Sequence, residues 1–566
     1  MSAPSATPSA AAPHTHEPGA DPRRWLALGA LVASTLVLSF DMTILNVALP
    51  SMAGQIHAGT GDLQWIVDSY TVVFAAAMLP AGLLGDRFGR RRMLVAGLVV
   101  FLAGSMIGTL AHSPGPVIVA RTVMGLGGAF VMPLALSVIP SLFGPADRPK
   151  AVAITSTSMA LGMPLGPIIG GALLEHFWWG SVFLINIPLV AISIVACVLL
   201  LPETRDPAAP RVDPVGTVCA AAGLGALVYG IIEAPDRGWA DPLVLGSLLG
   251  SVLLIAALVL RERGVSRPML DLSLLRQRGF LWNAVAATLV SFILTGLLFV
   301  LPSYLQTVLG YDAFGTGLRL LPMMGGLMVA ARLSAGLVRR FGPRPVIATG
   351  LLLLAAAAFL GATTGSGDGY GACATWQPIA GLGFGLAIVP SMDGALGALP
   401  RDRAGSGSGL LQTLRQTGSA VGVAILGSVL ASGYRDRLGS TGLTGAAART
   451  ARDSVVGAHQ VAAKLGDRAL AAAADRAYVH GMDLAIVVCG AAALAAAALV
   501  AVFLPDTRTP AAPGQASGKA AGNASGQASG QASGQASGQA TAPDARQDVP
   551  QGAPAPMAPK ATDARQ

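Results

Sequence analysis

The sequence predicts an all-α polytopic membrane protein with fourteen transmembrane helices, and three observations support this fold class. Of the 566 residues, 53% are hydrophobic and only 12% are charged, about half the charged fraction of an ordinary soluble domain. The mean hydropathy is +0.62. The apolar residues fall in long runs separated by short basic turns. Because an open sheet edge cannot be satisfied in lipid, these runs are expected to be helices.

The predicted spans follow one another along most of the chain, each long enough to cross a hydrocarbon core of roughly 30 Å. They lie near residues 25–50, 62–84, 93–111, 115–142, 151–173, 181–201, 212–233, 242–260, 281–303, 313–336, 345–364, 371–398, 407–431 and 481–504. With the N-terminus inside, the even-to-odd connections hold nearly all basic residues of the short turns. This asymmetry predicts cytoplasmic N- and C-termini in the cell membrane.

An internal repeat predicts how the spans are grouped. The turn Gly82–Arg92 returns in altered form at Ala335–Arg344, and Gly125–Pro133 resembles Gly381–Pro390. Two facing bundles of this kind suit alternating access to a site between them. The predicted domains are a disordered cytoplasmic N-terminus at 1–24, a six-helix bundle at 25–201, two linking helices with cytoplasmic connections at 202–280, a second six-helix bundle at 281–504 with an outer loop at 432–480, and a low-complexity cytoplasmic tail at 505–566.

Three charged residues lie at membrane depth, where a charge is costly and therefore a candidate for function. Asp41 lies about nine residues from the outer end of its span, roughly 13 Å deep at about 1.5 Å per residue, and Asp68 and Arg121 lie about 9 Å deep from the same side. An arginine stabilises an ionised carboxylate, whereas desolvation stabilises the protonated form. A site that alternates between these states could couple proton movement to transport. The alternative is a static ion pair.

Two further motifs lie between and within the spans. A turn after the second span carries candidate gating residues, namely Gly82, Asp86, Arg87, Gly89, Arg90 and Arg91. Asp86 could bind a nearby helix N-terminus or the arginines, although the arginines could equally serve orientation alone. In the fifth span, Gly162, Gly166 and Gly170 are four residues apart and share one helix face. With Pro167 and Gly171 they form a smooth, kinkable helix suited to sealing and rocking.

Polar and aromatic residues at membrane depth are the candidates for a substrate cavity. They are Phe40, Asn46, Phe130, Asn186, Phe299, Tyr304, Gln306, Gln412 and Arg415. Each could equally bond a neighbouring helix. No metal site is predicted, because the four cysteines all fall inside apolar runs without ligand spacing.

Four of these segments together resemble the major facilitator superfamily, specifically its fourteen-helix drug:proton antiporter branch (the EmrB/QacA type). Asp41–Pro50 resembles the first-helix motif of that branch, Gly82–Arg92 the loop 2–3 motif, Arg121–Gly128 the fourth-helix motif and Gly162–Gly171 the fifth-helix antiporter motif. The resemblance covers residues 25–505 and implies gating by the turn, proton coupling by the arginine, and export. Met124 departs from the fourth-helix motif, which often has glutamine there. The tenth span has no acidic residue in its interior, so dicationic drugs are less expected.

The leading interpretation is a proton-coupled antiporter that exports amphipathic drugs or antibiotics across the cytoplasmic membrane. The expected partners are a small amphipathic substrate, protons as the coupling ion and the lipid bilayer. No cofactor is expected, and the protein is expected to be a monomer and not an enzyme. Nucleic acid is not expected, because the net charge of +8 comes from short turns between apolar runs. The alternatives are a proton-coupled importer of a small metabolite and a non-transporting membrane protein.

Overall fold

The computed structural model describes residues 23–144, 147–205, 213–264, 272–399, 404–439 and 443–505. Within these ranges the chain is helical and contains no β-strand. The predicted low-complexity tail and almost all of the predicted disordered N-terminus lie outside the described residues.

The helices follow the apolar runs closely. The first part of the chain forms α1 (Arg24–Gln55), α2 (Thr60–Phe88), α3 (Arg90–Thr109), α4 (Pro114–Leu142), α5 (Arg148–His176), α6 (Ser181–Leu184) and α7 (Asn186–Leu200). The middle forms α8 (Pro214–Arg237), α9 (Pro242–Gly264) and the short η1 (Leu272–Arg276). The last part forms α10 (Arg278–Ser303), η2 (Tyr304–Val308), α11 (Ala313–Phe341), α12 (Pro343–Gly361), α13 (Tyr370–Gly397), α14 (Ala404–Leu438), α15 (Gly445–Asp453), α16 (Val455–Leu465) and α17 (Arg468–Phe503).

Fewer membrane-crossing helices are found in the described chain than the fourteen predicted, and the two remaining spans are not tested. Twelve helices of the described chain are long and apolar enough to cross a membrane, and a thirteenth is α2 if its two parts, which meet at Pro80 with a bend of 49°, form one span. The remaining predicted span, 151–173, lies in α5, a helix of 29 residues. The all-helical membrane fold is confirmed, and the count of fourteen is not.

The helices pack in two groups. In the first bundle, α1–α7, α1 packs against α5 and α7, while α2 and α3 pack against α4. In the second bundle, α10–α14 and α17, α13 packs against α11 and α12, while α14 packs against α10 and α17. Helix α8 contacts α9, α2 and α14, so it touches both bundles.

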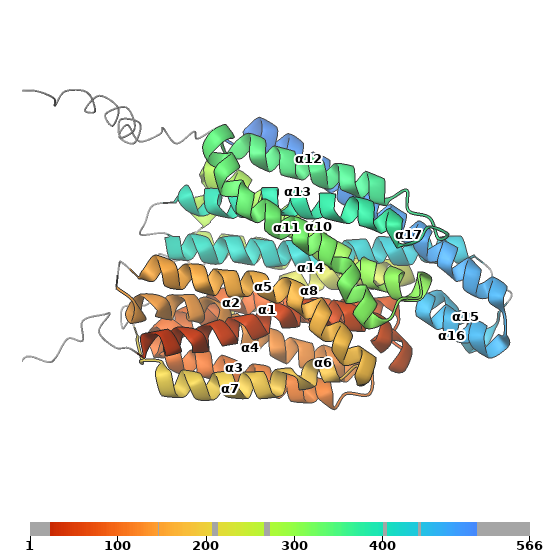
Figure 1. Cartoon of the computed structure of the whole chain (residues 1–566), viewed down its shortest axis with the longest axis horizontal. Helices are drawn as coiled ribbons and strands as arrows, with labels where there is room; N and C mark the ends of the chain where they lie inside the picture. The colour runs from red at the N-terminus through yellow and green to blue at the C-terminus, as the bar shows by residue number, and fades with distance from the viewer. Residues whose placement is uncertain are drawn as a thin grey trace, which may run out of the picture. The chain divides into compact units, whose positions relative to one another are not determined.

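The two ends of the bundles differ, and Figure 1 shows the difference along its horizontal axis. The start of α1 and the end of α17 lie at one end, which we call the terminal face, and α15 and α16 lie at the other, which we call the hairpin face. Near the hairpin face the bundles touch closely. The amide of Gln64 on α2 donates to the Val423 and Ala424 carbonyls of α14, at 3.2 and 2.9 Å. The Gln306 amide donates to the Val47 carbonyl at 2.8 Å. The two bundles are therefore tied together at this face.

The segment 432–480, predicted as an outer loop, is largely helical. Helix α14 continues to Leu438, α17 begins at Arg468, and α15 and α16 form a hairpin between them. Ser454 Oγ accepts the Gly457 N–H at 3.0 Å, and Asp467 Oδ1 accepts two N–H groups at the start of α17. Side-chain caps of this kind stabilise the starts of helices. They account for helices in a segment that is too polar to be predicted as a membrane span.

Candidate functional site

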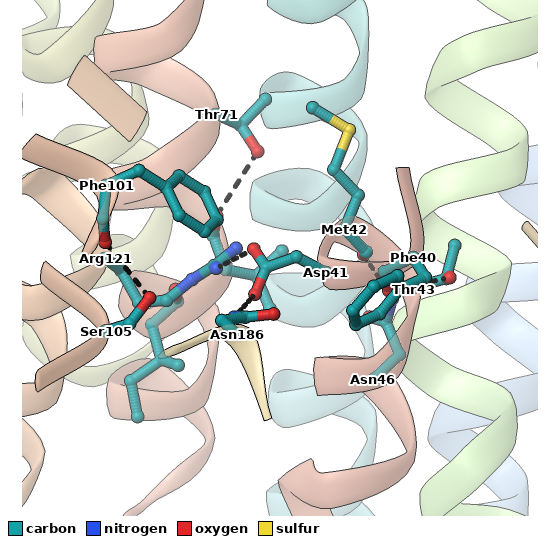
Figure 2. A network of polar contacts seen from close by, with 12 residues as sticks. Phe40, Asp41, Met42, Thr43, Asn46, Thr71, Phe101, Ser105, Arg121 and Asn186 are labelled. Carbon is teal, nitrogen blue, oxygen red and sulfur yellow. Dashed lines mark hydrogen bonds and ion pairs between the residues drawn. The ribbon is translucent and has the colours of Figure 1, made fainter. Parts of the chain in front are cut away.

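A buried ion pair joins the middle of α1 to α4 in the first bundle. Arg121 Nη1 donates to Asp41 Oδ2 at 2.8 Å, and each residue is only 2% exposed. Asn186 Nδ2, at the start of α7, donates to the other carboxylate oxygen at 2.8 Å. Figure 2 shows the arginine and the asparagine converging on the Asp41 carboxylate from different helices. Both oxygens of this carboxylate are therefore satisfied.

The arginine is held in place by its surroundings on α2. Its Nε donates to the Ile66 carbonyl at 3.3 Å, and its guanidinium carbon lies 4.2 Å from the centre of the Tyr70 ring, a distance at which the ring attracts the cation. Two glycines of α4 allow this close approach, because a Cβ on Gly125 would overlap the Tyr70 backbone and one on Gly128 would meet its hydroxyl. The glycine-rich stretch after Arg121 thus places the arginine beside α2.

The two charges of this site depend on each other. Removing one partner of a buried pair leaves the other charge uncompensated, which typically costs about 3–5 kcal/mol. A proton on Asp41 would have the same effect on Arg121 as removing the carboxylate charge. The pair is therefore stable when Asp41 is ionised, and a protonated Asp41 requires Arg121 to find other partners.

Asp68 does not join this pair, although the sequence predicted all three residues at similar depth. It is fully buried on α2, and neither carboxylate oxygen has a hydrogen-bond partner among the described residues. Gln64 and Val72, one helical turn to either side, contact α14 and the apolar cluster of α2, α8 and α14. Because residues four apart share a helix face, Asp68 lies on the face of α2 toward α14.

The candidate gating turn is tied within the first bundle. Asp86 Oδ1 accepts from Arg90 Nε at 2.8 Å, and Arg90 Nη1 donates to the Ser137 carbonyl of α4 at 3.0 Å. Arg91 Nε and Arg92 Nε each lie 3.6 Å from Glu203 Oε2, beyond the end of α7. The turn itself needs Gly89, whose φ of 116° is in the region that favours glycine. Arg87 lies over the ring of its neighbour Phe88, and Gly82 lies near Pro133 of α4.

The glycines of α5 serve two contacts. Gly162, Gly166 and Gly170 face α1, where a Cβ would overlap atoms of residues 39–44. Gly171 instead faces the start of α11, where a Cβ would overlap the Phe314 backbone. The carbonyl of Pro167 lies against Gly317 of α11. One stretch of α5 thus packs inside the first bundle and also meets the second near the hairpin face.

The nine candidate cavity residues do not form a single site. Asn186 binds Asp41, and Gln306 bridges the bundles as described above. Gln412 accepts from Arg415 Nη1 at 2.8 Å, and Arg415 Nε donates to Ser291 Oγ of α10 at 3.2 Å. This pair lies in the half of α14 toward the terminal face.

The other five candidates occupy separate places. Phe299 lines a cavity at the hairpin face, and Tyr304 donates to the Gly365 carbonyl at 3.3 Å. Phe130 packs against Gly97 of α3, and the Phe40 backbone lies against Gly166. Asn46 Nδ2 donates within its own helix, to the Met42 carbonyl at 3.2 Å.

Sequence reasoning missed two residues near or equivalent to the ion pair. Tyr70, under the guanidinium of Arg121, carried no signal of its own. Gln377 on α13 stands four residues before Gly381, as Arg121 stands four before Gly125, so the repeat already pointed to it. Gln377 is fully buried, and neither atom of its amide group has a partner among the described residues. Within that same part of the chain, no group of three or more His, Cys, Asp or Glu side chains could hold a metal.

Comparisons with known proteins agree with this architecture. The family model of the Major Facilitator Superfamily matches residues 31–423. The chain is 34% identical over 513 residues to the tetracenomycin C resistance and export protein of Streptomyces glaucescens, covering 88% of this chain and 95% of that protein. It is 33% identical to the multidrug efflux pump LfrA of Mycolicibacterium smegmatis, covering 85% and 96%.

A solved structure shares the fold. The bacterial homolog of the human lysosomal transporter Spinster, in an inward-facing and unoccupied conformation, matches with a TM-score of 0.64 and 19% identity, covering 87% of this chain and 100% of that one. The resemblance is confirmed at the level of the superfamily: the chain belongs to the Major Facilitator Superfamily and is a membrane transporter, not an enzyme.

Proposed function

We propose that this transporter is a proton-coupled antiporter that exports amphipathic drugs or antibiotics across the cytoplasmic membrane by alternating access. The observation that carries the proposal is the buried pair of Asp41 and Arg121, since a buried charge pair within a membrane is costly and marks a coupling site. Relatives named for drug resistance and efflux support the direction of transport. The transporter then works as a monomer, and the species that it moves are a small amphipathic molecule and protons.

The orientation of the protein follows from its basic turns. Most arginines of the short connections lie at the terminal face, among them Arg87, Arg90, Arg91, Arg92, Arg261, Arg263, Arg339 and Arg340. Positive residues favour the cytoplasmic side, so the terminal face is cytoplasmic and the hairpin face is external. We also propose that α2 and α5 cross the membrane, which gives fourteen spans and the drug:proton antiporter branch of the family.

Under this proposal, the contacts between the bundles identify the conformation of the transport cycle that the structure represents. Hydrogen bonds of Gln64 and Gln306 join the bundles at the external side. A transporter closed on that side takes up its substrate from the cytoplasm. Export requires these contacts to break while the cytoplasmic ends come together.

Protonation of Asp41 provides the coupling. In the outward-facing state a proton from outside adds to the Asp41 carboxylate, and the ion pair with Arg121 is lost. Arg121 keeps the Ile66 carbonyl and the Tyr70 ring as partners. After return to the inward-facing state the proton leaves to the cytoplasm and the pair re-forms. Asp68 is a second proton carrier, because its buried carboxyl group has no hydrogen-bond partner within the described part of the chain.

The first test is Asp41→Asn, which keeps the shape of the side chain and its bond to Asn186 but cannot ionise. We expect proton-driven uptake of drugs into inverted vesicles to fall to the level of vesicles without the protein, across a panel of amphipathic compounds. The exposed Glu175→Gln on α5 removes a carboxylate elsewhere and is the matched control. Undiminished proton-coupled uptake by a folded Asp41→Asn variant would remove this residue from the mechanism.

A further inference from the structure

The α15–α16 hairpin is anchored to the second bundle, whose helices α14 and α17 it connects. The Tyr434 hydroxyl of α14, on a side chain that is 3% exposed, donates to the Ala451 carbonyl at 2.7 Å and lies 3.3 Å from that of Ser454. His459 Nε2 lies 2.7 Å from Asp475 Oδ1 of α17. The hairpin therefore moves with the second bundle.

The same hairpin also holds the first bundle, through fewer and simpler contacts. Thr60 Oγ1, at the start of α2, donates to the Asp453 carbonyl at 2.8 Å. Gln460 Nε2 donates to the Gly54 carbonyl, near the end of α1, at 2.8 Å. Both are neutral hydrogen bonds, which are individually weak in net terms and easily exchanged for bonds to water. The Thr60 bond is also exposed, whereas the Tyr434 bonds of the anchor are buried, so this junction can open more readily than the anchor.

A cavity lies where the hairpin and the two bundles meet. Its lining comes from all three parts: Ala53 and Thr60 of the first bundle, Leu430 and Tyr434 of the second, and Ser454 and Val455 of the hairpin region. Its walls are mostly apolar, with hydroxyl groups between them. Any separation of the bundles at this face opens the cavity to the outside, and the hairpin covers it.

We infer that the α15–α16 hairpin is an external latch, which travels with the second bundle and must release α1 and α2 before substrate can leave. The inference rests on the alternating access proposed above. It assigns the release step to named contacts, those of Thr60 with Asp453 and of Gln460 with Gly54. The anchor through Tyr434 remains intact throughout.

A reversible covalent lock tests the latch directly. A Cβ at Gly59 would lie 3.5 Å from the Cβ of Asp453, within the range of about 3.5–4.5 Å that a disulfide requires. The backbone at Gly59, with φ −75° and ψ 174°, accepts any side chain. We expect oxidation to lower the rate of drug transport by the double variant Gly59→Cys/Asp453→Cys by about tenfold or more. A reducing agent should restore the rate.

The controls separate this result from the proposed function. Each single cysteine variant should transport equally well before and after oxidation, because neither can form the bond. If the reduced double variant and the parent transport none of the compounds, the proposed function is wrong. If the reduced variant transports and the cross-linked protein, verified by mass spectrometry, does so at the same rate, the latch is wrong.

A second measurement needs no substrate. A reporter Leu430→Cys in the cavity lining is labelled in whole cells with a membrane-impermeant maleimide, with the parent protein as background. Adding Thr60→Val and Gln460→Ala removes both latch bonds, and we expect labelling to become about tenfold faster, since each neutral bond contributes on the order of a factor of three to ten. An unchanged labelling rate would contradict the latch.

Discussion

The two bundles repeat one another in their packing and differ in their charge. Gly166 of α5 lies against the Phe40 backbone of α1, and Gly422 of α14 lies against the Phe292 backbone of α10 in the same way. Yet where the first bundle has Arg121, the second has Gln377, a buried amide without a described partner. Close helix packing is therefore common to both bundles, whereas the charge pair is present in only one of them.

The second bundle carries a charge of a different kind. Arg415 makes hydrogen bonds to neutral groups, those of Ser291, Gln412 and Met392. It forms no ion pair with a carboxylate of the described ranges. The first bundle therefore holds an ion pair, in which each charge compensates the other. The second bundle holds a single cation, Arg415, whose charge is stabilised only by uncharged polar groups.

The largest expected effect breaks the charge pair in the first bundle. Arg121→Gln copies the second bundle by placing glutamine at the equivalent position, and it leaves Asp41 buried without its counter-charge. We expect a loss of about 3–5 kcal/mol in the free energy of unfolding, measured by denaturation in detergent micelles at neutral pH. The double variant with Asp41→Asn should recover part of the loss. Equal stability of Arg121→Gln and the parent would show that the two bundles do not differ in this respect.

An intermediate effect should be the same in both bundles. Gly166→Ala and Gly422→Ala each place a methyl group against the backbone of a neighbouring helix. Overpacking of this kind costs about 1–3 kcal/mol, and we expect the two variants to lose similar stability in the same denaturation assay. Gly325→Ala on α11, where a Cβ meets nothing within 4 Å, is the control. A large difference in stability between the two variants would contradict the claim that both bundles pack alike at these glycines.

The smallest expected effect removes the isolated cation of the second bundle. Arg415→Gln leaves no opposite charge unpaired among the described residues, so only hydrogen bonds are lost. We expect a change of about 1–2 kcal/mol in unfolding free energy, clearly below that of Arg121→Gln. A loss as large as that of Arg121→Gln would reveal a counter-charge for Arg415 and would make the bundles more alike.

Depth along a helix could be predicted from the sequence, but direction around it could not. Counting residues placed Asp41, Asp68 and Arg121 at similar depth, and the structure joins only the first and last. Asp68 and Tyr70 are two residues apart on α2, so they point to nearly opposite sides of the helix. Tyr70 faces Arg121, and Asp68 faces α14. Only the packing of neighbouring helices decides which residue reaches the site.

The other differences between expectation and structure have the same cause. The hairpin of α15 and α16 is too polar to register as a membrane segment, and its caps at Ser454 and Asp467 gave only local signals. The candidate cavity residues were chosen for polar or aromatic character within spans, but Gln306 and Tyr304 each donate to a carbonyl of another segment. In contrast, the tight turn at Gly89 and the glycine face of α5 depend on local sequence, and the structure contains both features.

Helix α8 makes the two seams between the bundles mechanically unequal. On one side α5 meets α11 directly. On the other, α8 lies against both α2 and α14, with a hydrogen bond of 2.7 Å from Ser428 Oγ to the Ile231 carbonyl and an ion pair between Asp236 and Arg435. Separating α5 from α11 exposes two surfaces, whereas separating α2 from α14 also requires a third helix to slide or detach. The bundles should therefore part first, and furthest, along the α5–α11 seam.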